Sequence, residues 1–167
     1  MESGTEIVNE PRFVVDEMMG KLSRWLRMAG LDVEHRRPFL DEEILDIARK
    51  DGRVIVTRDR KLVETATELG LVAWVVDEDI PFNQLVEVMK RGGIDVRAKA
   101  FTRCTLCNGL LADIAKEDVA GKVPPFIFAT QTDYRYCAKC KKVYWPGTHR
   151  KHMEQILDDV ARAAGRK

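Results

Sequence analysis

Apolar residues in the first half of the chain follow two alternating patterns. Short apolar runs predict strands at 12–16, 31–37, 53–57 and 71–77. Apolar residues at helical spacing predict helices between and after these strands, at 20–29, 41–52, 61–69 and 82–90. Strands that alternate with helices in this way favour an α/β fold, in which helices cover a parallel sheet.

The pattern changes near Arg97, in the second half of the chain. We therefore expect a domain boundary at 94–101. The first domain is predicted to span 12–95, and the second 100–153, followed by a C-terminal helix to about residue 164. Segment 110–119 is expected to contain a helical turn or two. The C-terminal helix is predicted to be amphipathic, with an apolar side formed by Met153, Ile156, Leu157 and Val160.

Composition and charge are those of a globular protein with a real core. The 167 residues are 45% hydrophobic and 33% charged, and 28 basic residues nearly balance 27 acidic ones. A net charge of +1 argues against a purely electrostatic binder of nucleic acid, although a local basic patch remains possible. No apolar stretch approaches the roughly 20 residues of a membrane span, and we find no signal segment. We therefore expect a cytoplasmic protein without a membrane partner.

Acidic residues lie where the predicted strands end. Asp16 ends the first strand, Asp59 lies just beyond the third, and Asp77 ends the fourth. The carboxyl ends of parallel strands share one edge of the sheet, and ligands of open α/β sheets bind outside that edge. The helix after the second strand should begin at the same edge. The candidate catalytic residues are therefore Asp16, Asp41, Glu42, Asp59, Asp77 and Asp79.

Each acid alone has a simpler interpretation, since Asp is a common N-cap of helices. Taken together, three or four carboxylates at one edge would repel one another unless a cation neutralised them. Hard oxygen ligands suit Mg²⁺ or Mn²⁺, which can activate water against a phosphodiester. The predicted ligands of this ion are Asp16, Asp41, Asp59 and Asp77.

Basic residues surround the same predicted edge and could hold an RNA backbone. Three of them recur at three-residue spacing along the first helix, and two flank the acid after the third strand. A phosphate chain over an acidic metal site would need such flanking charge. The competing interpretation is an ordinary solvated surface. The predicted RNA-binding residues here are Lys21, Arg24, Arg27, Arg58 and Arg60.

Four cysteines form two Cys-x-x-Cys pairs and predict a zinc site. The pairs are Cys104 with Cys107 and Cys137 with Cys140. Zn²⁺ prefers four tetrahedral ligands, and four thiolates leave no open position for chemistry. We therefore expect a zinc ribbon, in which a structural Zn²⁺ on four cysteine ligands holds together a segment too small for its own core. Unrelated buried or redox-active cysteines are the alternative, which the paired spacing disfavours.

Aromatic and basic residues crowd the second cysteine pair. Single-stranded RNA stacks its bases on aromatic rings and pairs its phosphates with cations. We assign Tyr136, Lys139 and Lys142 to such contacts. Alternatively, the aromatic residues form the small core of the ribbon, which is our preferred interpretation for Trp145.

The ordered combination of segments resembles the Mut7-C RNase domain family, a PIN-like nuclease domain joined to a zinc ribbon. The similarity is carried by the paired cysteines and by "FVVDEMMGKLSRWLRMAGLDV", "DEEILDIAR", "VIVTRDRKL" and "YWPGTHRKHM". It extends from about Phe13 to about Met153. The resemblance implies a PIN-like three-layer domain and a metal-dependent RNase. The implied acids are Asp16, Asp41 or Glu42, Asp59, and Asp77 or Asp79, and Thr57 with Asp59 matches the PIN pattern Thr-x-Asp.

Two functions from different classes follow from these patterns. The leading one is a ribonuclease in which an acidic pocket binds Mg²⁺ or Mn²⁺ and cleaves RNA, expected to be single-stranded, while the zinc ribbon helps to position the strand. The rival is a non-catalytic RNA- or protein-binding zinc module, in which the acids only cap helices. Metal-dependent cleavage of RNA distinguishes the two.

Overall fold

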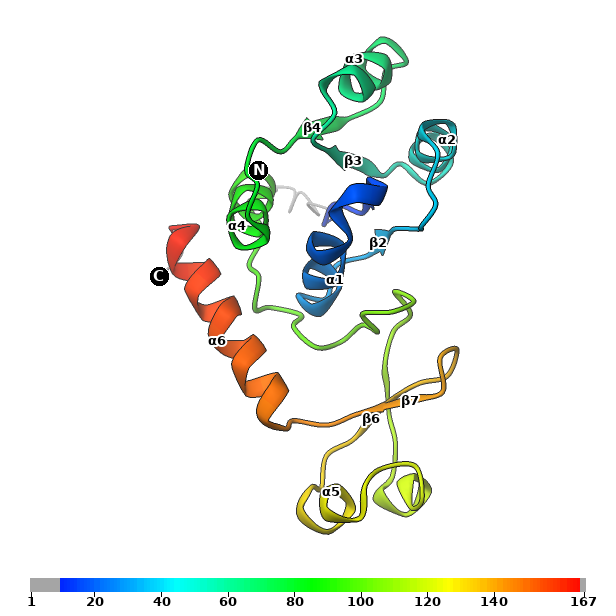
Figure 1. Ribbon diagram of the computed structural model, residues 1–167, viewed down its shortest axis with the longest axis vertical. Helices are drawn as coiled ribbons and strands as arrows, with labels where there is room; N and C mark the ends of the chain where they lie inside the picture. The colour runs from blue at the N-terminus through cyan, green and yellow to red at the C-terminus, as the bar shows by residue number, and fades with distance from the viewer. Residues whose placement is uncertain (1–9, 166–167) are drawn as a thin grey trace, which may run out of the picture.

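The structure is a computed structural model, and it describes residues 10–165. Its first part contains four parallel strands in the order β2-β1-β3-β4 (Figure 1). The chain runs from β1 outward to β2 and then crosses back to β3, so the strand order reverses between β1 and β3. The strands are β1 (Phe13–Val15), β2 (Val33–Glu34), β3 (Val54–Thr57) and β4 (Ala73–Val75).

Helices cover both faces of this sheet, which makes three layers (Figure 1). Helices α1, α4 and α6 pack on one face, and α2 and α3 pack on the other. The predicted α/β class with a parallel sheet is therefore confirmed. The helices are α1 (Gly20–Met28), α2 (Asp41–Asp51), α3 (Arg60–Glu68), α4 (Pro81–Gly92) and α6 (Thr148–Ala163), and a 3-10 turn, η1 (Glu17–Met19), precedes α1.

Two hydrophobic cores form because successive side chains of a strand point to opposite faces. Phe13 and Val15 pack under α1, α4 and α6, whereas Val14 between them packs under α2 and α3. All three side chains are fully buried. Burial on both faces explains why the sequence of these strands is continuously apolar.

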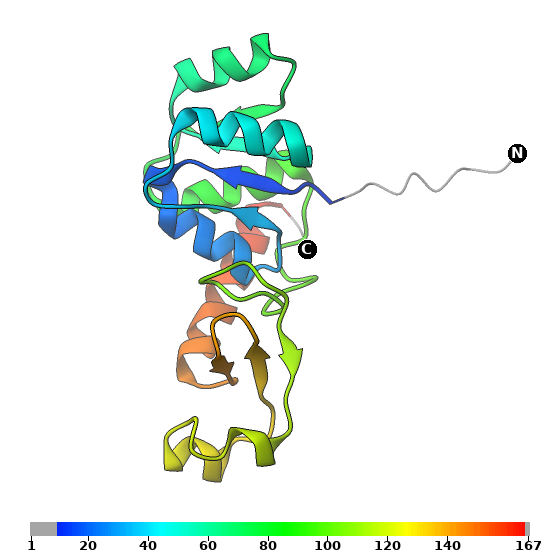
Figure 2. The same ribbon diagram turned by 90° about the vertical axis from the view of Figure 1, so that its right-hand side faces the viewer.

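The second part is a small antiparallel sheet with the order β5-β6-β7, at the bottom of Figure 2. It has its own core around Val119, Tyr134 and Val143. Segment 110–119, expected to add a helical turn or two, contains a strand and one 3-10 turn. The sequence patterns did not predict helix α5, which has Pro in its first turn, where Pro is tolerated. The elements are β5 (Ala112–Asp113), η2 (Lys116–Val119), α5 (Pro125–Thr130), β6 (Arg135–Cys137) and β7 (Lys142–Tyr144).

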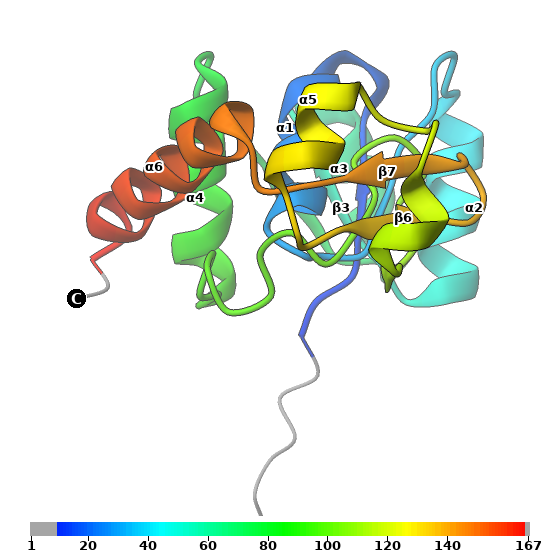
Figure 3. The same cartoon turned by 90° about the horizontal axis from the view of Figure 1, so that it is seen from below.

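Helix α6 leads the chain from the small sheet back to the first core. It runs beside α4 (Figures 1 and 3), and its Leu157 and Val160 are buried among the residues of that core. Met153 and Ile156 pack at the edge of the same core, so the predicted apolar side is confirmed. The described helices include none that is long and apolar enough to cross a membrane.

Candidate functional site

The carboxyl ends of the parallel strands meet at one edge of the sheet, on the left in Figure 2. Thr57 is the last residue of β3, and Asp16 lies just beyond β1. At this edge the Thr57 hydroxyl donates to Asp16 Oδ2 at 2.8 Å. The same Thr57 oxygen accepts from the backbone N–H of Asp59 at 3.0 Å. Thr57 is fully buried, so it fixes the carboxylate of Asp16 relative to the backbone of Asp59. The strand order reverses here, which is where open α/β sheets bind ligands.

Asp41 shares the electrostatic environment of these two acids, from the start of α2. Partial burial raises the pKa of the Asp41 carboxyl, and the negative charges of Asp16 and Asp59 raise it further. A cation between them would relieve this repulsion. Asp41 and Glu42, the alternative at this position, are both exposed in the first turn of α2, and a raised pKa is found for Asp41. We name Asp16, Asp41 and Asp59 the acidic edge.

Capping accounts for only one member of the acidic edge. Asp59 caps α3, since its Oδ1 accepts from the backbone N–H of Lys61 at 2.9 Å and of Leu62 at 3.4 Å. Asp16 makes no capping hydrogen bond to η1. The N-cap of α2 is Leu40, and Asp41 is the first residue of the helix. N-capping therefore does not explain Asp16 or Asp41, although Asp41 in the first turn of α2 complements the helix dipole.

The two candidates for a fourth acid lie beyond β4 in exposed ion pairs. Arg60 donates to Asp77 Oδ1 at 2.6 Å, and Arg58 donates to Asp79. The side chains of Asp77 and Asp79 are 69% and 78% exposed. Arginine balances both charges here, so either acid would have to leave its ion pair to bind a cation.

Arg27 does not lie on the basic surface that the sequence predicted. Its residue is only 5% exposed, and its guanidinium donates to the carbonyl of Val33 at 2.9 and 3.0 Å. It also donates to the carbonyls of Thr105 and Leu106 at 3.2 and 3.1 Å. The prediction of an RNA contact by Arg27 is therefore wrong, because the helix turns this position inward. Lys21 and Arg24 are exposed on α1 as expected.

We expect Arg27→Lys to lower the free energy of unfolding by about 1–3 kcal/mol, although the charge is kept. A lysine ammonium cannot reproduce the planar fork that satisfies three carbonyls. Urea unfolding followed by circular dichroism measures the effect, with the exposed Arg24→Lys as the matched control. A variant as stable as the wild type would contradict this structural role.

His35 is a residue of this edge that the sequence interpretation missed. It follows β2 directly, and its Nδ1 lies 3.1 Å from the carbonyl oxygen of Val15, next to Asp16. A carbonyl accepts, so Nδ1 carries a proton and donates it to this carbonyl. Its position in the sequence could have indicated this, because His35 follows the end of a strand, as Asp16 does. The predicted strand 31–37 was too long and placed His35 inside it.

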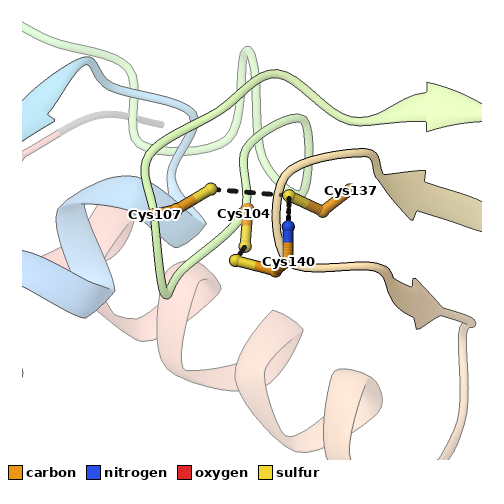
Figure 4. A group of neighbouring side chains, drawn as sticks. All are labelled: Cys104, Cys107, Cys137 and Cys140. Atoms are coloured by element: carbon orange, nitrogen blue, oxygen red, sulfur yellow. Dashed lines mark hydrogen bonds between the residues drawn. The ribbon is translucent and has the colours of Figure 1, made fainter.

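The four cysteines converge from two loops, as Figure 4 shows. All four sulfurs lie within 4.8 Å of one another, with Cys104 and Cys140 3.9 Å apart and Cys107 and Cys137 3.4 Å apart. A tetrahedral zinc with Zn–S bonds of about 2.3 Å places its sulfurs roughly 3.8 Å apart. The donor set and the spacing therefore fit Zn²⁺.

Tyr144 supports this cluster from β7. Its hydroxyl lies 3.1 Å from Cys104 Sγ. Burial raises the pKa of the Cys104 thiol, but hydrogen bonds from Tyr144 and from the amides of Cys107 and Leu106 bring it down to about 6 overall. Burial and this hydrogen bond raise the pKa of Tyr144 itself. Cys104 is thus favoured as a thiolate, the form that binds metal.

The first cysteine loop is also bonded to the parallel sheet. The Asn108 side chain accepts from the backbone N–H of Val33 at 2.9 Å and donates to Asp32 at 2.7 Å. Asp32 in turn pairs with the buried Arg53 at 2.8 Å. Together with Arg27, these contacts attach the cysteine cluster to β2 and α1. Spacing alone identified the cysteines but gave no sign of this attachment.

The acidic edge is less compact than the cysteine cluster. Within residues 10–165, the cysteines are the one group of three or more His, Cys, Asp or Glu residues whose ligand atoms all lie within 4.8 Å. Mg²⁺ keeps several waters and is usually bound through one or two carboxylates. The oxygen donors and the mutual repulsion of the acidic edge therefore fit such a partly hydrated cation.

Comparison with known protein families gives one result for most of the chain. The model of the Mut7-C RNAse domain matches residues 11–157. Neither the curated proteins nor the solved structures include a match to this chain. The description of the family suggests a ribonuclease-like function, and the match includes both the acidic edge and the four cysteines. The chain belongs to the Mut7-C RNAse domain family.

Proposed function

We propose that the chain is a metal-dependent ribonuclease that hydrolyses phosphodiester bonds of single-stranded RNA at the acidic edge. The observation that carries this proposal is the Thr57 hydroxyl, which links Asp16 with Asp59 where the strand order reverses. The raised pKa of Asp41 supports it, because this pKa reflects the charges of both other acids. The family description supports the same class of activity.

In this proposal the residues of the acidic edge have distinct tasks. Asp16 and Asp41 would bind the cation, since neither is occupied by a helix cap. Asp59 would bind the cation through Oδ2, because both capping hydrogen bonds to α3 use Oδ1. A bound Mg²⁺ or Mn²⁺ would supply an activated water and would stabilise the charge that develops on the phosphate. Asp77 or Asp79 would complete the site after separation from arginine.

Exposed cations near this edge would orient the RNA strand. Lys21 and Arg24 lie on the solvent side of α1, the helix that follows Asp16. Arg58 and Arg60 flank Asp59 and are exposed. On the ribbon, Tyr136, Lys139 and Lys142 remain proposed contacts. These charges would attract a phosphate backbone in a salt-dependent way.

The second candidate function is a zinc module that binds RNA or protein without catalysis. The cap that Asp59 forms on α3 favours it, because this acid has a structural task in any case. In that case the cysteine cluster would be the single metal site of the chain. The two functions make opposite predictions about metal-dependent cleavage.

Incubation of the full chain with fluorescently labelled single-stranded RNA tests the proposal. We expect cleavage with Mn²⁺ or Mg²⁺, little with Ca²⁺, and none after chelation, because Ca²⁺ prefers more ligands and a looser geometry. Asp46→Asn, on the exposed part of α2, serves as a control that purifies in the same way. Absence of cleavage with every metal and RNA would favour the binding module.

A further inference from the structure

A cleft of about 750 Å³ lies where the ribbon meets the start of α6. Its walls come from β6, β7, the segment around Phe101 and the first turns of α6. This volume lies within the range of roughly 300–1,000 Å³ typical of ligand pockets. Neither the acidic edge nor the cysteine sulfurs line the cleft.

Aromatic rings line the walls of the cleft, and cations lie over two of them. Phe101, Tyr144 and Trp145 contribute rings. The Arg150 guanidinium lies 4.5 Å from the centre of the Phe101 ring, and Lys142 Nζ lies 5.1 Å from the centre of the Tyr144 ring. Base stacking on aromatic rings beside such cations is the usual way in which proteins hold single-stranded nucleic acid.

The charge of the lining also favours an anionic strand. The basic side chains that line the cleft outnumber Asp113 and Asp133, its acidic ones; they are Arg103, Arg135, Lys142, His149 and Arg150. Arg135 donates to the Phe101 carbonyl at 2.9 Å, and Arg150 pairs with Glu154 at 3.2 Å, so both are already engaged. Lys142 and His149 are exposed and therefore available to a phosphate.

The first turn of α6, which lines the cleft, lies on the same side of the molecule as the carboxyl edge of the parallel sheet. In Figure 2 the start of α6 and the carboxyl edge of the parallel sheet both lie on the left, and in Figure 3 both lie toward the top.

We propose that this cleft binds an unstacked base of single-stranded RNA, with its neighbouring phosphate on Lys142 and on Arg150, which would exchange the exposed Glu154 for the phosphate. The inference deepens the proposed function, since it identifies where the substrate strand is held away from the acidic edge. It also shifts the expected ribbon contact from the turn between the cysteines to the junction with α6. Of the predicted ribbon contacts, Lys142 lines the cleft, whereas Tyr136 and Lys139 are not among its lining residues.

Fluorescence anisotropy with a short labelled oligouridylate tests the proposal, without added Mg²⁺ or Mn²⁺ so that the RNA stays intact. We expect Lys142→Gln and Arg150→Gln each to weaken binding about fivefold to tenfold. Lys151→Gln, exposed on the same helix and outside the cleft lining, should bind like the wild type. Wild-type affinity in both cleft variants would overturn the proposal, as would an absence of binding by the wild type.

Tryptophan fluorescence provides a second readout that does not depend on the charge variants. Oligouridylate should quench the emission of the wild type, and Trp145→Phe should lose this quenching, because Trp25 and Trp74 pack against the other core. Quenching that persists in Trp145→Phe would contradict a base in the cleft.

These outcomes separate the two proposals. Binding in the cleft without metal-dependent cleavage would support RNA binding by the cleft and contradict the proposed ribonuclease activity. Cleavage by the wild type, together with normal RNA binding by both cleft variants, would support the ribonuclease activity and contradict RNA binding in the cleft.

Discussion

Asp16→Asn should lower the rate of Mn²⁺-dependent RNA cleavage by more than about a hundredfold, since even changes around metal ligands cost 10–100-fold. The amide carries no negative charge, so the acidic edge loses much of its attraction for a cation. The fold should persist, because the amide oxygen can still accept the hydrogen bond that Thr57 donates to Asp16. Initial rates on labelled RNA measure the loss, and circular dichroism verifies the fold.

Asp59→Asn separates catalysis from capping at the same edge. Asn caps helices about as well as Asp, so α3 should keep its N-terminal hydrogen bonds. The proposed function predicts a loss of cleavage with nearly unchanged stability. Wild-type rates in both Asp16→Asn and Asp59→Asn, with Asp46→Asn as the reference, would mean that these acids do not serve catalysis.

Cys104→Ser should abolish stable zinc binding and unfold the ribbon, the second large effect that we expect. Cys104 is fully buried within the cluster, and the ribbon core contains only a few buried side chains. Structural zinc contributes about 10–16 kcal/mol of apparent binding free energy in small zinc domains, far more than such a core supplies. The stability of the part with the parallel sheet should fall as well, because Arg27 of α1 donates to the carbonyls of Thr105 and Leu106.

Elemental analysis and limited proteolysis measure this effect. We expect one zinc per wild-type chain, and rapid cleavage of Cys104→Ser within the unfolded ribbon. Ala138→Ser changes an exposed residue between two ligands and should retain its zinc. A wild-type chain without zinc, or a stable Cys104→Ser ribbon, would contradict the zinc assignment.

Strand ends and cysteine spacing were predictable because they depend on local patterns. The parallel strands are buried on both faces, so their apolar runs stand out, and each run ends where a polar edge begins. This placed Asp16 and Asp59 at one edge without any knowledge of tertiary contacts. The hydrogen bonds of Thr57 to both acids needed the strand order, which local sequence does not contain.

Features that depend on packing between distant segments were not predictable. Arg27 lies three residues after Arg24 and has the same chemistry, yet it faces the cysteine loop and is buried. Its side chain is stabilised by carbonyls about eighty residues away, which no helical pattern reveals. Similarly, α6 follows the ribbon in sequence but buries Leu157 in the first core. The cleft depends on this return of the chain, so it too is invisible in the sequence.

Anomalous scattering from crystals soaked with Mn²⁺ tests the central claim most directly. The account predicts a Mn²⁺ peak among the carboxylates of Asp16, Asp41 and Asp59, beside the Thr57 hydroxyl. This peak should disappear in Asp16→Asn, while the zinc signal at the four cysteines remains. Mn²⁺ bound elsewhere on the chain, with none at the acidic edge, would contradict the account.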